Sequence, residues 1–191
     1  MILKVVAAVL FVVIVGVLGI LAYSGLFNKV EISKQEVGPY VFAYLEHKGS
    51  YYDVNSEMTQ VYEGLKAMGV ETQLGIGIYY DNPQQVAQED LRSEVGSIIN
   101  EADWDKLDQI KQQFKVKKIE KQSSDVAHFE AKTPLSYMIA PLKVYPAFGK
   151  YLEAQGMALP DLGVEIYDVP NKKILYVMIG SQTLVDVEEQ N

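Results

Sequence analysis

The chain contains no cysteine, only two histidines and a single tryptophan among its 191 residues. Without cysteine it forms no disulfide, which is compatible with either side of a membrane. His47 and His128 stand apart from any spaced carboxylates, so we expect no metal site and no cofactor. A phosphate-binding glycine motif and a Ser, His and Asp spacing for acyl transfer are also missing. These absences leave no candidate catalytic residue of the common kinds.

Basic residues are scarce as well. The 17 Lys and Arg residues face 25 Asp and Glu residues, which gives a net charge of −8. A nucleic-acid binder gains affinity from a basic face that contacts phosphates. The longest basic cluster, Lys115 to Lys118, includes Val116 and is more typical of a strand with one solvated face. We therefore expect no nucleic-acid ligand, and we expect the acidic tail over residues 184–191 to be solvated.

Charge is absent from one long apolar run, residues 5–27. A helix of about 20 apolar residues crosses a bilayer core. A cleaved signal peptide usually has an apolar region of about 7–15 residues, and this run is longer, although Ala22-Tyr23-Ser24 could serve as a cleavage site. We predict a single-pass membrane anchor over residues 1–28, in contact with lipid through residues 5–27. The flanking Lys residues leave both orientations open.

Two short segments, GIGIYYDNP and GVEIYDVP, share one pattern. Tyr80 of the first and Tyr167 of the second lie 87 positions apart, and at this offset Glu165 stands where the first segment has Ile78. Residues two apart in a strand share a face, so Glu165 and Tyr167 are expected side by side. One copy thus offers an aliphatic residue with a phenol, and the other a carboxylate with a phenol.

The same offset pairs further residues, including Phe42 with Phe129 and Leu65 with Leu152. We interpret this as a duplication with pseudo-repeats over about 30–99 and 114–182. Each half is too small to bury a sheet alone, so the halves must pack against each other.

Each half is expected to contain two strands, a helix and two more strands. Gly38-Pro39 breaks the first two strands and suggests a hairpin, Asp53 is a candidate helix cap, and Gly69 ends that helix. In the second half, Pro141 falls at the predicted helix start. The expected strands cover 30–37, 40–48, 74–80, 91–99, 114–121, 125–132, 164–168 and 174–180.

Three motifs together resemble a known family. They are Gly49-Ser50-Tyr51, the segment 77–83 followed by Leu91-Arg92-Ser93-Glu94, and the segment 164–170. They resemble the gyrase-inhibitory-protein-like (GyrI-like) family, which includes the effector-binding domains of AraC- and MerR-type regulators and is similar to the SOUL haem-binding group. With its anchor, the chain also resembles an animal endoplasmic-reticulum autophagy receptor that has one N-terminal span and one such domain.

The resemblance implies an α+β fold of duplicated strand–helix–strand–strand units. They would form one concave antiparallel sheet surface with helices behind it, over residues 29–183, preceded by the transmembrane helix. In the family, ligands lie in the cleft between the two repeats. The acidic residue of the family matches Glu165 here, and in drug-sensing members that carboxylate pairs with lipophilic cations among aromatic rings.

We therefore predict a membrane-anchored small-molecule-binding domain whose ligand is lipophilic or cationic. Glu165 would supply the charge, and Tyr167, Tyr80 and Trp104 the apolar wall. Glu165 could instead be an exposed strand residue, and Trp104 could simply pack under the segment Asp103–Phe114, which has the pattern of a short amphipathic helix. Two alternatives stay open: a hydrolase of electrophilic small molecules using Glu165 with a Tyr, and a non-catalytic membrane-tethered adaptor. The absence of a catalytic constellation favours binding over catalysis.

Overall fold

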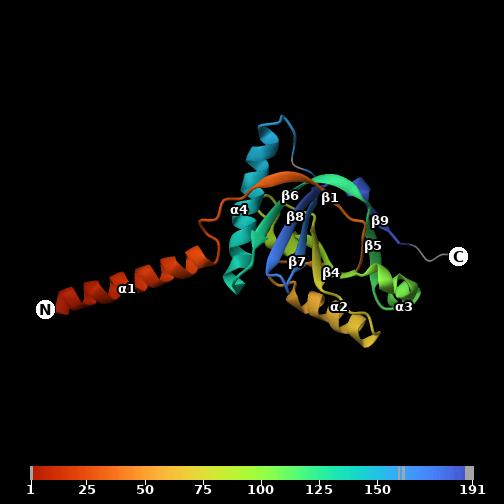
Figure 1. Cartoon of the computed structure of the whole chain (residues 1–191), viewed down its shortest axis with the longest axis horizontal. Coiled ribbons are helices and arrows are strands. Elements are labelled where there is room, and N and C mark those ends of the chain that lie inside the picture. The colour runs from red at the N-terminus through yellow and green to blue at the C-terminus, as the bar shows by residue number, and fades with distance from the viewer. Residues whose placement is uncertain (1, 159, 161, 188–191) are drawn as a thin grey trace.

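A nine-stranded antiparallel sheet forms the body of the computed structural model, which describes residues 2–158, 160 and 162–187. The strands are β1 (Ile32–Val37), β2 (Tyr40–Lys48), β3 (Leu74–Tyr79), β4 (Arg92–Ile99), β5 (Lys115–Ile119), β6 (Gln122–Glu130), β7 (Leu162–Asp168), β8 (Lys173–Ile179) and β9 (Leu184–Asp186). The helices are α1 (Ile2–Tyr23), α2 (Asn55–Ala67), α3 (Leu107–Lys111) and α4 (Pro134–Glu153). The sheet is curled, with α2 and α4 along its outside (Figure 1), which confirms the predicted α+β class.

The strand order β1-β6-β8-β7-β3-β4-β2-β5-β9 reflects the duplication. Strands β3 and β7 pair at the centre, and each half continues outward from them with the same succession of elements. The first strand of each half, however, is exchanged: β1 pairs with β6 of the second half, and β5 pairs with β2 of the first. The predicted hairpin of β1 and β2 is therefore wrong, because a local pattern specifies extended backbone but not the strand's partner.

Alternation along the strands gives the sheet two buried faces. The inner face packs against itself across the curl, with Phe42, Ile76 and Ile166 among its residues. The outer face is covered by α2 over one half and by α4 over the other. Both helices therefore flank the central β3–β7 pair, where the two halves meet.

Helix α2 follows the predicted periodicity. Val61 and Leu65 are fully buried against the outer face, and Gly69, with φ of +72°, ends the helix as predicted. Its start differs from the prediction, because Val54 and not Asp53 occupies the N-cap position, and no side chain caps the helix there.

Helix α4 begins earlier than predicted. It starts at Pro134, where Thr133 and Ser136 form a reciprocal capping box, and Pro141 and Pro146 lie inside the helix. The capping box and a proline in the first turn are a strong start signal. The prediction that placed Pro141 at the helix start is therefore wrong.

The sheet extends further at the C-terminal end than predicted. Residues Leu184–Asp186 form β9 and pair with β5, so they are part of the sheet, and Val185 and Asp186 are exposed to solvent. Glu188 and Glu189, which belong to the predicted acidic tail, lie outside the described residues.

Helix α1 projects away from the sheet domain (Figure 1), and none of its 22 residues is buried. Its length and composition are sufficient for a membrane span, as predicted. The helix ends at Tyr23, four residues before the end of the predicted apolar run, and the chain then turns. Leu21 and Leu26 pack against the cluster that α4 forms with the sheet.

Candidate ligand-binding site at Glu165

Glu165 lies on β7 at the junction of the two halves, on the outer face of the sheet between α2 and α4. Its cross-strand neighbours are Gly77 on β3 and Tyr176 on β8. The residue is only 7% exposed. The alternative of an exposed strand residue is therefore excluded.

Tyrosines surround the carboxylate. The hydroxyl of Tyr145, from α4, donates to Oε1 at 2.9 Å, and that of Tyr167 donates to Oε2 at 3.0 Å. Tyr79 extends the network, with its hydroxyl 2.6 Å from that of Tyr167. The hydroxyl of Tyr176 is buried without a hydrogen-bond partner in the described part of the chain. The site thus combines one carboxylate with four phenols.

Glycines on the same face make room for these rings. A Cβ built on Gly77 would lie 2.7 Å from the Tyr79 hydroxyl, and one on Gly163 would lie 2.6 Å from the Tyr145 hydroxyl. Any side chain at these positions would collide with a tyrosine. The glycines of the two repeated segments are therefore a sequence signal for the position of the tyrosine cluster.

Burial controls the ionisation of this cluster. Removal from water raises the pKa of Glu165 to about 7, although the hydrogen bonds from Tyr145 and Tyr167 oppose the rise. Burial, and then the nearby Glu165 charge, raise the pKa of both phenols well above the usual value for tyrosine. Near neutral pH the phenols therefore remain protonated donors, while Glu165 is divided between its two forms.

The aromatic surroundings continue beyond the carboxylate. The ring of Tyr51 meets that of Tyr79 edge-on at 4.8 Å, and the partly exposed Tyr137 of α4 lies 6.2 Å from Tyr167. The rings of Tyr145, Tyr167, Tyr79 and Tyr176 thus lie close around Glu165. Two surface hollows, one beside Phe114 and one along α1, lie elsewhere.

The sequence comparison decides the family. A profile of GyrI-like small-molecule-binding domains matches residues 30–177, which is most of the chain. The chain belongs to the GyrI-like family. This agrees with the resemblance drawn from its motifs and assigns the residues around Glu165 to a small-molecule-binding domain.

Two curated proteins match most of this chain. The mouse (Mus musculus) testis-expressed protein 264 homolog is 32% identical over 155 residues, covering 76% of this chain and 48% of that protein. Human (Homo sapiens) testis-expressed protein 264 is also 32% identical over 155 residues, covering 76% of this chain and 47% of that protein. The chain therefore spans about half the length of the curated relatives it matches.

Among solved structures, the EcmrR C-terminal domain aligns with a TM-score of 0.52 at 10% identity, over 84% of this chain and 99% of that domain. EcmrR in its DNA complex aligns with a TM-score of 0.54 at 10% identity, over 97% of this chain and 70% of that one. At this level of identity the likeness shows a common fold and no more.

The GyrI-like domain brings together two of the four residues predicted for the site, Glu165 and Tyr167. Tyr80 lies on the inner face, where its hydroxyl is 3.5 Å from the Lys117 ammonium that pairs with Glu94 at 2.5 Å. Consecutive strand residues point to opposite faces, so Tyr79 and not Tyr80 reaches Glu165.

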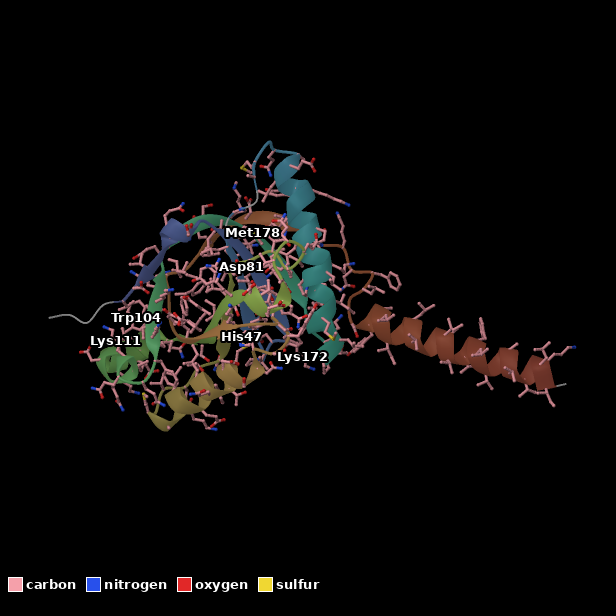
Figure 2. All side chains as sticks on the ribbon, turned by 180° about the vertical axis from the view of Figure 1, so that it is seen from behind. His47, Asp81, Trp104, Lys111, Lys172 and Met178 are labelled. Carbon is pink, nitrogen blue, oxygen red and sulfur yellow. The ribbon has the colours of Figure 1, made fainter. Side chains whose placement is uncertain are left out.

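Trp104 lies in the connector between the two halves, in the 3₁₀ turn Glu101–Lys106 that precedes α3. It packs against the buried cluster under α2 together with Leu107. Figure 2 shows it beside Lys111, at the end of the domain away from α4. The structure therefore agrees with the simpler interpretation, in which this tryptophan packs under the connector.

Within the described residues, no group of three or more His, Asp and Glu side chains is placed to hold a metal ion. His47 instead contacts the Glu57 carboxylate at 2.9 Å and the Ser50 carbonyl at 3.1 Å.

Proposed function

We propose that this GyrI-like domain binds a hydrophobic cation at Glu165, between α2 and α4, while α1 anchors the domain in a membrane. The observation that carries the proposal is a buried carboxylate whose hydrogen-bond partners are phenols and not a basic side chain. Burying a carboxylate without a countercharge costs several kcal/mol. A bound cation would supply that countercharge.

The tyrosines suit such a ligand. A cation over an aromatic face gains about 0.5–2 kcal/mol per ring. The phenols around Glu165 stay neutral because burial raises their pKa, so their faces would attract a cation without adding charge. Because Glu165 is only 7% exposed, a ligand must displace at least one of these rings to reach its carboxylate.

The binding test uses a series of quaternary cations, from tetramethylammonium to tetraphenylphosphonium. Isothermal titration calorimetry on the full chain in lipid nanodiscs would measure the affinity. Tetraphenylborate, of similar shape and opposite charge, is the ligand control, and Glu165→Gln is the protein control. We expect at least one cation to bind and to lose tenfold or more in affinity, about 1.4 kcal/mol, in E165Q. Equal affinities in the two proteins would contradict the role of Glu165.

The anchoring half of the proposal rests on α1. Its 22 residues measure about 33 Å at about 1.5 Å per residue, enough for a hydrocarbon core of about 30 Å. No side chain of α1 is buried in the domain. We expect the chain to stay with membranes after alkaline extraction, and a deletion of residues 2–23 to release it. Extraction of the full chain would contradict the anchor.

A membrane-tethered adaptor is the second candidate, because Glu165 is only 7% exposed and its carboxylate already accepts hydrogen bonds from two tyrosines. The calorimetric series separates the two candidates, since an adaptor predicts no binding that depends on Glu165. Hydrolysis is not favoured, because the family profile that matches this chain describes a small-molecule-binding domain.

A further inference from the structure

The side of α4 that faces away from the sheet is apolar. Leu135, Met138 and Leu142 are 38%, 51% and 69% exposed, and their spacing of three and four residues places them on one side of the helix. From Pro134 to Gly149 the helix carries a single charged residue, Lys143.

The corresponding helix of the first half, α2, has an ordinary outer side. Thr59, Gln60, Glu63 and Lys66 are exposed there, and Tyr62 is the one large apolar residue among them, at 41% exposed. The fold therefore does not require an apolar outer side. A helix that is apolar on every side is normally covered by something.

Helix α4 is tied to the end of α1. The Ser24 hydroxyl lies 2.7 Å from the Thr133 hydroxyl at the N-cap of α4. The Lys143 ammonium, about three turns further along α4, donates to the Leu26 carbonyl. The only charge on the first four turns of α4 is thus used to hold the segment that follows α1. The end of α1 and the first half of α4 are therefore held together.

The direction of the two helices matters as much as the contact. Figure 1 shows α4 on the side of the domain nearest α1 and running across the direction of α1. If α1 follows the bilayer normal, α4 lies along the bilayer surface. Tyr23 and Phe27, at 63% and 68% exposed, then lie at the level of the lipid headgroups, where aromatic residues are frequent.

We propose that α4 lies on the surface of the same membrane that α1 spans, with Leu135, Met138 and Leu142 in the boundary between headgroups and acyl chains. This inference rests on the proposed anchor. Lipid is the occupant we infer because α1 holds a bilayer permanently beside this face, whereas a protein partner would have to displace it. Since α4 also carries Tyr145, a ligand dissolved in the bilayer would lie next to the site at Glu165.

The absence of cysteine makes the test direct. Nitroxide labels are placed singly at Met138→Cys and Leu142→Cys in the full chain, reconstituted into phosphatidylcholine vesicles. Tyr62→Cys on the outer side of α2 is the matched control, and Val12→Cys in α1 reports the anchor. Electron paramagnetic resonance then measures the collision of each label with oxygen, which enters lipid, and with a water-soluble nickel complex.

We expect the labels at 138 and 142 to favour oxygen over nickel at least threefold more than the label at 62, and the label at 12 to be the most protected. Nickel access at 138 and 142 equal to that at 62, with position 12 protected, would overturn the docking of α4 and leave the anchor intact. Nickel access at position 12 would show that the anchor itself is wrong, and the docking would fall with it.

Discussion

Replacing Glu165 by glutamine should make the domain more stable at alkaline pH. The amide of E165Q has nearly the same shape as the carboxyl group but never ionises. Moving the pKa of Glu165 from 4.5 to about 7 corresponds to a cost of about 3 kcal/mol for the ionised form, at about 1.4 kcal/mol per pKa unit. The natural chain bears this cost when Glu165 is ionised, and the variant does not.

The sign follows from proton linkage. Below pH 4.5 the carboxyl is protonated in both the folded and the unfolded chain, so it contributes no pH-dependent cost. Between 4.5 and about 7 the folded chain retains a proton that the unfolded chain has lost, so stability falls as the pH rises. Above 7 the group is ionised in both states, and the full cost remains.

The assay is urea unfolding in a nonionic detergent, followed by the fluorescence of Trp104, the single tryptophan. Trp104 packs in the cluster under α2 and so reports on the domain and not on α1. The stability of E165Q relative to the natural chain should rise by about 3 kcal/mol between pH 4 and pH 8. Other titrating groups cancel in this difference. A stability difference that stays constant from pH 4 to pH 8 would show that Glu165 ionises as easily in the folded chain as in the unfolded one.

Three further variants test the tyrosine cluster at Glu165 and the buried ion pair of Lys117 with Glu94, each by urea unfolding. Tyr145→Phe removes a donor to the buried carboxylate and should lower the free energy of unfolding by about 1–3 kcal/mol at pH 8. The loss should be smaller at pH 4, where Glu165 is protonated, because the lost hydrogen bond stabilises the ionised form. An equal loss at both pH values would contradict this role of Tyr145. Gly77→Ala should cost about 1–3 kcal/mol, since the added Cβ would lie 2.7 Å from a tyrosine hydroxyl, and an unchanged midpoint would show that the ring moves freely. Lys117→Met leaves the buried carboxylate of Glu94 without its positive partner and should lower the free energy of unfolding by about 3–5 kcal/mol. The double variant with Glu94→Gln should restore most of this loss. If it restores none, the loss comes from packing and not from the unpaired charge.

The fold class could be predicted because it depends on features that repeat. Strand-forming segments, the amphipathic helix that ends at Gly69 and the family motifs all point to the same α+β unit. The pairing of β1 with β6 could not be predicted, because the segment 32–37 is extended in either arrangement and its partner lies some 90 residues away.

The offset of 87 explains why Tyr80 was selected and Tyr79 was not. Odd-numbered residues lie on the outer face in both β3 and β7. Two residues in equivalent positions on these strands are therefore separated by an even number of positions. An odd offset matched Tyr167 to Tyr80, on the inner face. A shift of one residue in a strand moves every side chain to the other face.

The two tyrosines that donate to Glu165 differ in their distance from it along the sequence. Tyr167 is two residues away on the same strand, so alternation alone placed it correctly. Tyr145 lies 20 residues away on α4, and the predicted late start of that helix left its direction undefined. The sequence signal for its position is indirect, since Gly163 leaves the space that the Tyr145 ring occupies.

The decisive measurement is the titration of the buried carboxyl group of Glu165. With ¹³C-labelled glutamate, and E165Q to assign the resonance, the carboxyl carbon shift reports the pKa of this residue alone. We expect a pKa of about 7 for Glu165, and a fall in that pKa when a saturating quaternary cation binds. A pKa near the ordinary value for glutamate, or one that no cation changes, would contradict it.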